Sequence, residues 1–89
     1  MEGRILTADI IDGFRKNLEL QEKSTATIEK YIRDVKAFSV YAQNEVITKE
    51  TVIVYKNHLQ ENYAVRSMNS MLASINSLFA FLNWFDLRV

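Results

Sequence analysis

The stretch STATIEKYIRDVKAFSVYA, residues 24–42, decides the fold class of this chain. Apolar side chains recur in it at spacings of three and four residues, at Ile28, Tyr31, Ile32, Val35, Phe38 and Ala42. Charged and polar residues fill the positions between them. This periodicity is typical of an amphipathic helix that buries one face. Since Ser24 or Thr25 can serve as the N-cap, we predict a helix over residues 25–43.

The sequence on either side of this helix predicts three more helices, over residues 8–21, 49–61 and 67–84. Thr7, Thr48 and Ser67 are the expected N-caps. Residues 52–54, VIV, are β-branched and would also suit a strand, but the cap before them favours a helix. The chain contains no proline and only two glycines, so it offers few hairpin signals. We therefore expect an all-α fold, a compact four-helix bundle that forms a single domain over residues 1–89.

Composition limits the classes of protein to which the chain can belong. Its 89 residues suffice for one domain, and 48% hydrophobic with 25% charged residues suits a globular protein. The chain has no cysteine, which excludes a disulfide framework and fits a reducing compartment. No apolar run reaches the roughly 20 residues of a membrane span, and the N-terminus lacks the pattern of a signal peptide. We expect a cytoplasmic protein with no membrane partner.

The sequence offers no arrangement of residues that would support catalysis. His58 is the only histidine, and the carboxylates lack the spacing of a metal loop. No glycine-rich loop could cradle a phosphate, and nothing positions a Ser/His/Asp set. We expect no catalytic residue, no metal, no cofactor and no small-molecule ligand.

The helix over residues 25–43 has features that suit an anionic partner. Its N-terminus carries the hydroxyl residues Ser24, Thr25 and Thr27, and a helix N-terminus favours anions. Lys30, Arg33 and Lys36 then recur every third residue, so they can meet consecutive phosphates. The formal net charge of the chain is zero, which argues mildly against nucleic acid. An ordinary solvated face is the alternative interpretation of these cations.

The last predicted helix has an uncharged outer face. No charged residue occurs between Arg66 and Asp86, and the outward positions hold Ser67, Asn69, Ser70, Ala73, Ser74, Asn76, Ser77, Ala80 and Asn83. Short neutral side chains allow a helix backbone to approach a duplex closely, and asparagine can bond an adenine edge. Packing against another helix or domain would explain the same face. Trp84 and Phe85 would either close the core or be covered by another domain.

Taken together, these segments resemble the N-terminal core-binding domain of tyrosine recombinases, the phage-integrase and Xer-type family. The likeness runs over roughly residues 7–85 and depends on the order and spacing of three motifs. The middle one is ITKE at residues 47–50. The other two comprise Ser24, Thr27, Ile28, Tyr31, Asp34, Val35 and Phe38 in the second helix, and Ser67, Met68, Asn69, Leu72, Ile75, Phe79 and Leu82 in the last.

The resemblance implies a SAM-like bundle that forms half of a clamp around double-stranded DNA during DNA integration and recombination. The catalytic domain would be absent from this chain, so the chain would not be an enzyme although its parent would be a recombinase. Its partners would be DNA, the C-terminal catalytic domain and sister subunits of a synaptic assembly. The implied DNA-binding residues are Ser24, Thr25, Thr27, Lys30, Arg33, Lys36, Arg66, Ser67, Asn69, Ser70, Ala73, Asn76 and Ser77. The alternative is a helical protein-interaction module that uses the uncharged face of the last helix.

Overall fold

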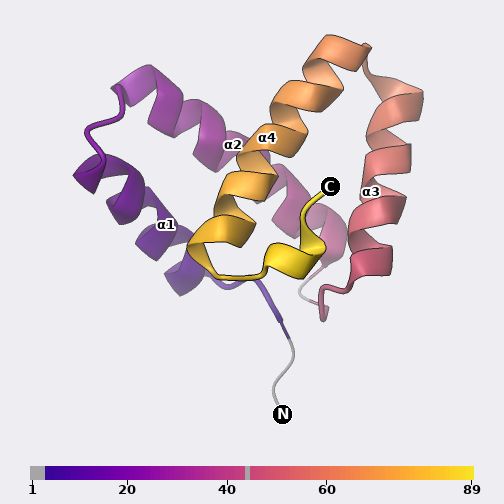
Figure 1. Cartoon of the computed structure of the whole chain (residues 1–89), viewed down its shortest axis with the longest axis horizontal. Helices are drawn as coiled ribbons and strands as arrows, with labels where there is room; N and C mark the ends of the chain where they lie inside the picture. The colour runs from indigo at the N-terminus through magenta and orange to yellow at the C-terminus, as the bar shows by residue number, and fades with distance from the viewer. Residues whose placement is uncertain (1–3, 44) are drawn as a thin grey trace.

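The computed structural model describes residues 4–43 and 45–89, and these residues form four α-helices and a short closing turn. The predicted all-α, four-helix fold is confirmed, and residues 52–54 are helical and not a strand. No described helix is long and apolar enough to cross a membrane. The elements are α1 (Ala8–Leu20), α2 (Thr25–Ala42), α3 (Lys49–Asn62), α4 (Val65–Phe81) and the 3-10 turn η1 (Phe85–Leu87) (Figure 1).

The first three helices have side-chain N-caps, and these are the residues that the sequence predicted. The Thr7 hydroxyl accepts a hydrogen bond from the Ile10 N–H at 3.2 Å, and the Ser24 hydroxyl accepts one from the Thr27 N–H at 3.1 Å. At α3, Thr48 and Thr51 each accept a bond from the other's main-chain N–H, which makes a reciprocal capping box. Each cap satisfies a donor that the first helical turn leaves without a partner.

The predicted bounds of the last helix, residues 67–84, were wrong at both ends. α4 starts at Val65, and its N-cap Ala64 has no side chain that could cap it. It stops at Phe81 because Asn83 adopts a left-handed backbone, with φ of 61°. The Asn83 and Trp84 N–H groups then bond back to the carbonyls of Ala80 and Phe79, at 3.1 and 2.7 Å. This is a Schellman ending, formed here by asparagine instead of the more usual glycine.

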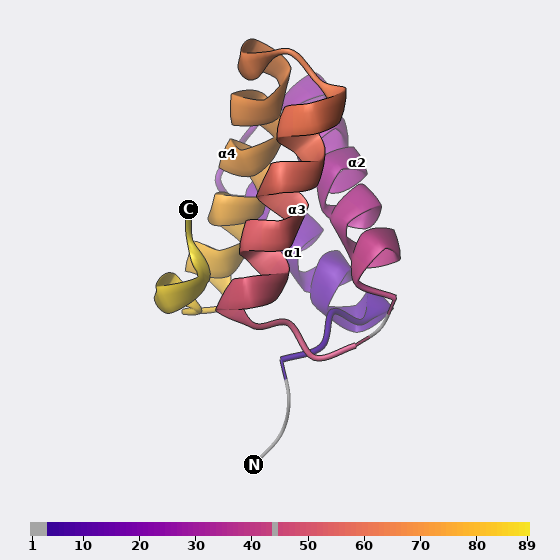
Figure 2. The same cartoon turned by 90° about the vertical axis from the view of Figure 1, so that its right-hand side faces the viewer.

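The four helices share one core, and α4 contributes to most of it. α4 crosses in front of α2 in Figure 1 and is flanked by α3, whereas α1 packs mainly on α2. When the molecule is turned by 90°, α3 lies in front, with α4 on one side and α2 on the other (Figure 2). Phe38 of α2 contacts Phe79 of α4 and Tyr55 of α3, with ring centroids 6.0 and 4.9 Å apart. These aromatic contacts join three helices at the centre of the bundle.

The segment after α4 folds back and closes one end of the core. Leu87 of η1 is 1% exposed, so it is the apolar plug at this end. Trp84 is half-buried against Phe79, with the Arg4 guanidinium 5.6 Å from its ring centroid. Phe85 stays 51% exposed, so of the two aromatic residues expected to close the core or be covered, only Trp84 packs inward.

Candidate nucleic-acid interface

A surface hollow of about 530 Å³ lies between α2 and α4 and brings the two predicted binding segments together. Five of the thirteen predicted residues line it, although they stand up to 40 positions apart in the sequence. They are Lys30 and Arg33 from α2, and Arg66, Ser67 and Ser70 from α4. Asp34, Ala37, Tyr63 and Met71 complete the lining. The crossing of two helices therefore builds a site that neither segment forms alone.

The hollow is basic although the whole chain is neutral. Three cations and one carboxylate line it, which gives it a formal charge of +2. The guanidinium groups of Arg33 and Arg66 are on exposed residues and form no ion pair within residues 4–43 and 45–89. Arginine can bind a phosphate with two parallel N–H bonds, so this pair suits a phosphodiester backbone.

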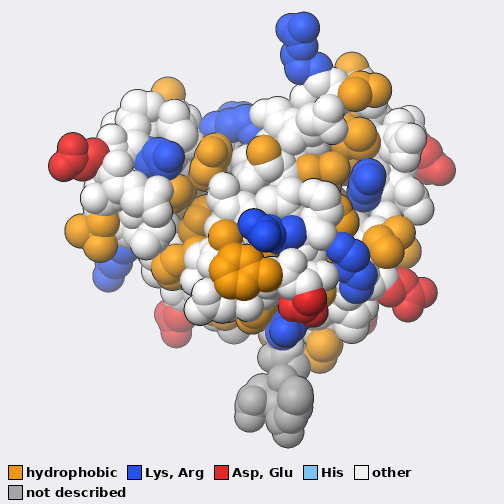
Figure 3. Space-filling model, viewed as in Figure 1, with side chains coloured by type: hydrophobic (Ala, Val, Ile, Leu, Met, Phe, Trp, Pro, Cys, Tyr) orange, Lys and Arg blue, Asp and Glu red, His pale blue; other side chains and the backbone are white. Residues whose placement is uncertain are grey.

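Two acidic residues line a different hollow. Glu45 and Glu50 line a second hollow, where the C-terminal end of α2 meets the start of α3, and no lysine or arginine lines that hollow. In the view of Figure 3, Lys and Arg side chains are spread over the centre and the margin of the face, whereas most of the Asp and Glu side chains visible there lie along the margin. The two hollows therefore have formal charges of opposite sign, +2 and −2, in a chain whose net charge is zero.

Lys30 makes internal bonds inside the first hollow. Its ammonium donates to the Asp34 carboxylate at 2.5 Å, to the Ser70 carbonyl at 3.0 Å and to the Ser74 hydroxyl at 3.1 Å. The Ser74 hydroxyl in turn donates to Asp34 at 2.8 Å. Asp34 is one of the charged residues between the apolar positions of α2, so the periodicity predicts that it is exposed. The structure buries it where α2 meets α4, and the bonds from Lys30 and Ser74 offset the cost of burying its charge.

The other predicted residues of α2 lie outside this hollow. Ser24 and Thr27 bond each other through their hydroxyls at 2.9 Å as well as through the cap, so both stabilise the start of α2. Thr25 and Lys36 are exposed. Lys36 does not line the hollow, so the row of three cations expected on one face is divided, with Lys30 turned toward α4.

The uncharged face of α4 is also only partly exposed to solvent. Asn69 and Ala73 are exposed, whereas Ser74, which also belongs to that face, is fully buried against Asp34. The side-chain amide of Asn76 pairs with the main chain of Val89 and so holds the C-terminal segment against α4. Of the residues of this face, Ser67, Asn69, Ala73 and Asn83 are exposed, as the sequence suggested.

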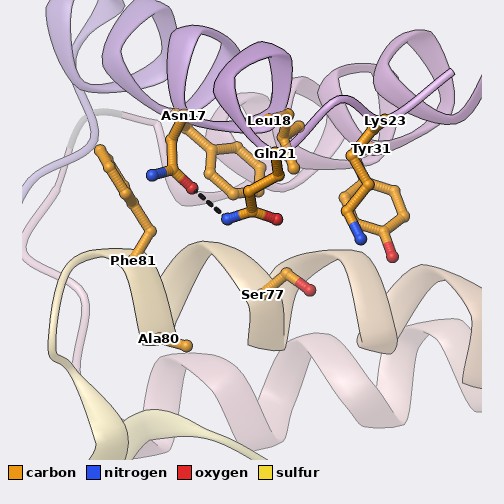
Figure 4. A pocket seen from close by; sticks show the side chains of 9 residues that line it. Asn17, Leu18, Gln21, Lys23, Tyr31, Ser77, Ala80 and Phe81 are labelled. Atoms are coloured by element: carbon orange, nitrogen blue, oxygen red, sulfur yellow. Dashed lines mark hydrogen bonds between the residues drawn. The ribbon is translucent and has the colours of Figure 1, made fainter. Parts of the chain in front are cut away.

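Ser77 lines a third hollow, of about 420 Å³, between α1 and α4 (Figure 4). The side-chain amide of Gln21 donates to that of Asn17 at 2.7 Å on its α1 wall. No sequence motif pointed to the polar residues Asn17, Gln21 and Lys23, and Tyr31 belongs to the apolar stripe of α2. The i,i+4 spacing of Asn17 and Gln21 was the available signal, since it places both on one flank of α1.

Two groups with shifted pKa values, Tyr55 and Asp86, do not line any of these hollows. Burial, followed by the nearby charge of Asp34, raises the pKa of Tyr55 to about 12. The hydrogen bond from Arg4 lowers the pKa of Asp86 below its usual 3.8. Among the residues that the structure describes, no three His, Cys, Asp or Glu side chains are grouped to hold a metal ion.

Comparison with known protein families identifies the family of the chain. The model of the family described as phage integrase, N-terminal SAM-like domain, matches residues 11–85. The chain belongs to this family. No curated protein and no solved structure matches it significantly. The match is to the N-terminal domain of phage integrases and not to their catalytic domain.

The matched residues of this integrase SAM-like domain contain every helix that builds the basic hollow. Residues 11–85 take in all of α2, α3 and α4 and most of α1, together with all thirteen predicted binding residues. The predicted core-binding fold is therefore confirmed at the level of the family. The Xer-type branch stays a prediction.

Proposed function

We propose that this domain binds duplex DNA and forms one half of the clamp by which a tyrosine recombinase holds its substrate. The observation that supports this is the convergence of Arg33 and Arg66, from two different helices, on one basic hollow. One guanidinium group on each wall suits the phosphate backbone, which supplies a large share of the affinity in protein–DNA binding. The parent protein would carry out strand transfer in DNA integration or recombination, with its catalytic domain as the other half of the clamp.

Sequence recognition would come from the part of α4 that remains exposed. Asn69 and Ala73 lie outward beside the hollow, where a short side chain lets the helix approach a groove. Asn69 can donate and accept at an adenine edge, whereas the arginines contact phosphates whatever the sequence. Ser24, Thr25, Thr27, Lys36 and Ser77 would add contacts to the DNA backbone, whereas Asn76 is engaged with Val89. Sister recombinase subunits in the synaptic assembly are further proposed partners.

Fluorescence anisotropy with a labelled duplex tests the proposal directly. The logarithm of the binding constant should fall linearly with the logarithm of salt concentration. Arg33→Gln and Arg66→Gln should each reduce the slope by about 0.9, the value for one phosphate contact. Arg15→Gln is the matched control, because Arg15 already bonds Glu29 at 3.1 Å. Absence of binding by the unchanged domain at low salt would refute the proposal for this chain.

The protein-interaction alternative remains distinguishable from DNA binding. Two observations weigh against the uncharged face as a docking surface: Ser74 is buried, and Asn76 already holds the C-terminal segment. Light scattering of the domain with Asn69→Arg would test what is left of that face. A mass that falls on substitution would support association through it, whereas an unchanged mass would count against it.

A further inference from the structure

Asp34 is a buried carboxylate at the base of the basic hollow. It is 5% exposed, and its Oδ2 atom accepts hydrogen bonds from the Lys30 ammonium at 2.5 Å and the Ser74 hydroxyl at 2.8 Å. A carboxylate leaves water at great cost unless it is paired and hydrogen-bonded, and Asp34 is both. A fixed negative charge therefore lies directly beneath the cations of the hollow.

This arrangement uses the full donor capacity of Lys30. An ammonium group has three N–H donors, and Lys30 has three acceptors within bonding distance: Asp34, the Ser70 carbonyl and the Ser74 hydroxyl. While these bonds hold, Lys30 has no donor left for a phosphate. Arg33 and Arg66, by contrast, form no ion pair within the described part of the chain.

The same bonds fix the geometry of the hollow. Lys30 and Asp34 belong to α2, whereas Ser70 and Ser74 belong to α4, so the bonds join the two helices where they cross. The walls that carry Arg33 and Arg66 are thus held at a set separation. Removal of the charge at Asp34 would weaken this connection and release the lysine.

We propose that Asp34 is a positioning residue of the DNA interface, which holds Lys30 against α4 and so withholds its ammonium from DNA, leaving Arg33 and Arg66 to contact the phosphates. The inference rests on the proposed function, DNA binding through this hollow. It assigns Lys30 a different role from the phosphate contact that its spacing with Arg33 and Lys36 had suggested. Lys30 acts as an internal brace, and Asp34 sets the number of cations that DNA meets.

The slope of binding against salt counts phosphate contacts and so distinguishes the two roles of Lys30. Asp34→Asn keeps the shape of the side chain and its capacity to accept from Ser74, but it carries no charge. The freed ammonium should add one contact and steepen the slope by about 0.9, which is about threefold more affinity lost between 50 and 200 mM salt. Lys30→Gln should leave the slope at the wild-type value. Arg33→Gln is the matched control and should reduce it.

A purely structural role for Asp34 would weaken binding without steepening the slope. Circular dichroism must first show that each variant is folded at the assay temperature, and if Asp34→Asn is not, Lys30→Gln decides alone. An unchanged slope for folded Asp34→Asn would overturn the inference, as would a slope for Lys30→Gln that falls as much as for Arg33→Gln. Failure of the wild-type domain to bind would instead refute the proposed function, and the inference with it.

Discussion

Asn76 bonds the main chain of Val89 in both directions, with its Nδ2 atom 2.7 Å from the Val89 carbonyl and its Oδ1 atom 3.0 Å from the Val89 N–H. The side-chain amide thereby makes a pair of hydrogen bonds that ties the C-terminal segment to α4. Lys49 reinforces the contact from α3, since its ammonium donates to the Arg88 carbonyl at 2.6 Å. Together these bonds hold the segment that carries Leu87 into the core.

Asn76→Ala should loosen this segment with little effect on the rest of the fold. Both hydrogen bonds are lost at an exposed site, so we expect the free energy of unfolding to fall by about 1 kcal/mol. Amide hydrogen exchange at Val89 should become fast, whereas exchange in α2 should be unchanged under native conditions. Asn69→Ala is the control, because no hydrogen bond ties the exposed Asn69 side chain to the segment. Equal exchange at Val89 in both variants would contradict the role of Asn76.

Gly13→Ala should stabilise the domain. Gly13 lies inside α1, and a methyl group there would meet the Phe81 ring at 3.6 Å, an ordinary van der Waals contact. Alanine is the better helix former by about 1 kcal/mol, so urea denaturation should show a gain of about 0.5–1 kcal/mol. The converse control is Ala37→Gly within α2, which should lose about as much. A loss of stability in Gly13→Ala would mean that α1 and α4 approach more closely than described.

A serine at position 64 should supply the cap that α4 lacks. The backbone of Ala64, with φ of −63° and ψ of 155°, nearly repeats that of the working cap Ser24, at −66° and 156°. The hydroxyl of Ala64→Ser can therefore accept from the Ser67 N–H, and the midpoint of urea unfolding should rise by the equivalent of about 1 kcal/mol. Thr48→Ala, which removes a cap from α3, should lower it by a similar amount. No gain in Ala64→Ser would show that the first turn of α4 is already satisfied.

The ion pair between Arg4 and Asp86 should add a pH dependence to stability at acid pH. The Arg4 guanidinium lies 2.9 Å from the Asp86 carboxylate, and its hydrogen bond lowers the pKa of that carboxyl below 3.8 in the folded chain. The contribution is therefore complete above the unfolded pKa of 3.8 and is lost as the pH falls through the lower folded value.

Thermal unfolding of Asp86→Asn at pH 6 and at pH 2.5 measures this contribution. The difference in Tm between the variant and the wild type should shrink at the lower pH, because protonation of the wild-type carboxyl removes the charge that Arg4 stabilises. Asp12→Asn is the control, because Asp12 is exposed on α1 and has no ion-pair partner in the described chain. A constant difference at both values would show that the pair contributes nothing to folding.

The sequence predicted the starts of the helices well where a capping side chain determines the start. Thr7, Ser24 and Thr48 cap three helices because their hydroxyls reach the first turn, and such caps are visible in a sequence. The ends of α4 were not visible. Its start has no capping side chain, and its end depends on Asn83 in a conformation for which glycine is the usual indicator.

The candidate site was predicted in its parts but not in its arrangement. The spacing of cations in its helix pointed to Arg33, whereas Arg66 was named as a binding residue through the family resemblance. The burial of Asp34 depends on Ser74, 40 residues further along the chain, so no local window contains it. The same distant contact turned Lys30 inward. Helical periodicity indicates which face a residue occupies, but the neighbour that covers this face is known only after the helices have packed.

The hollow at Arg33 and Arg66 has a formal charge of +2 and the hollow at Glu45 and Glu50 one of −2, and these opposite charges contribute an electric dipole to a neutral domain. Such a body feels little net pull in the field of a polyanion but does feel a torque, which turns its basic end forward. Screening confines that torque to about 8 Å at physiological salt. The domain would thus gain orientation rather than speed as it approaches a duplex, and salt would act mainly on how long it stays.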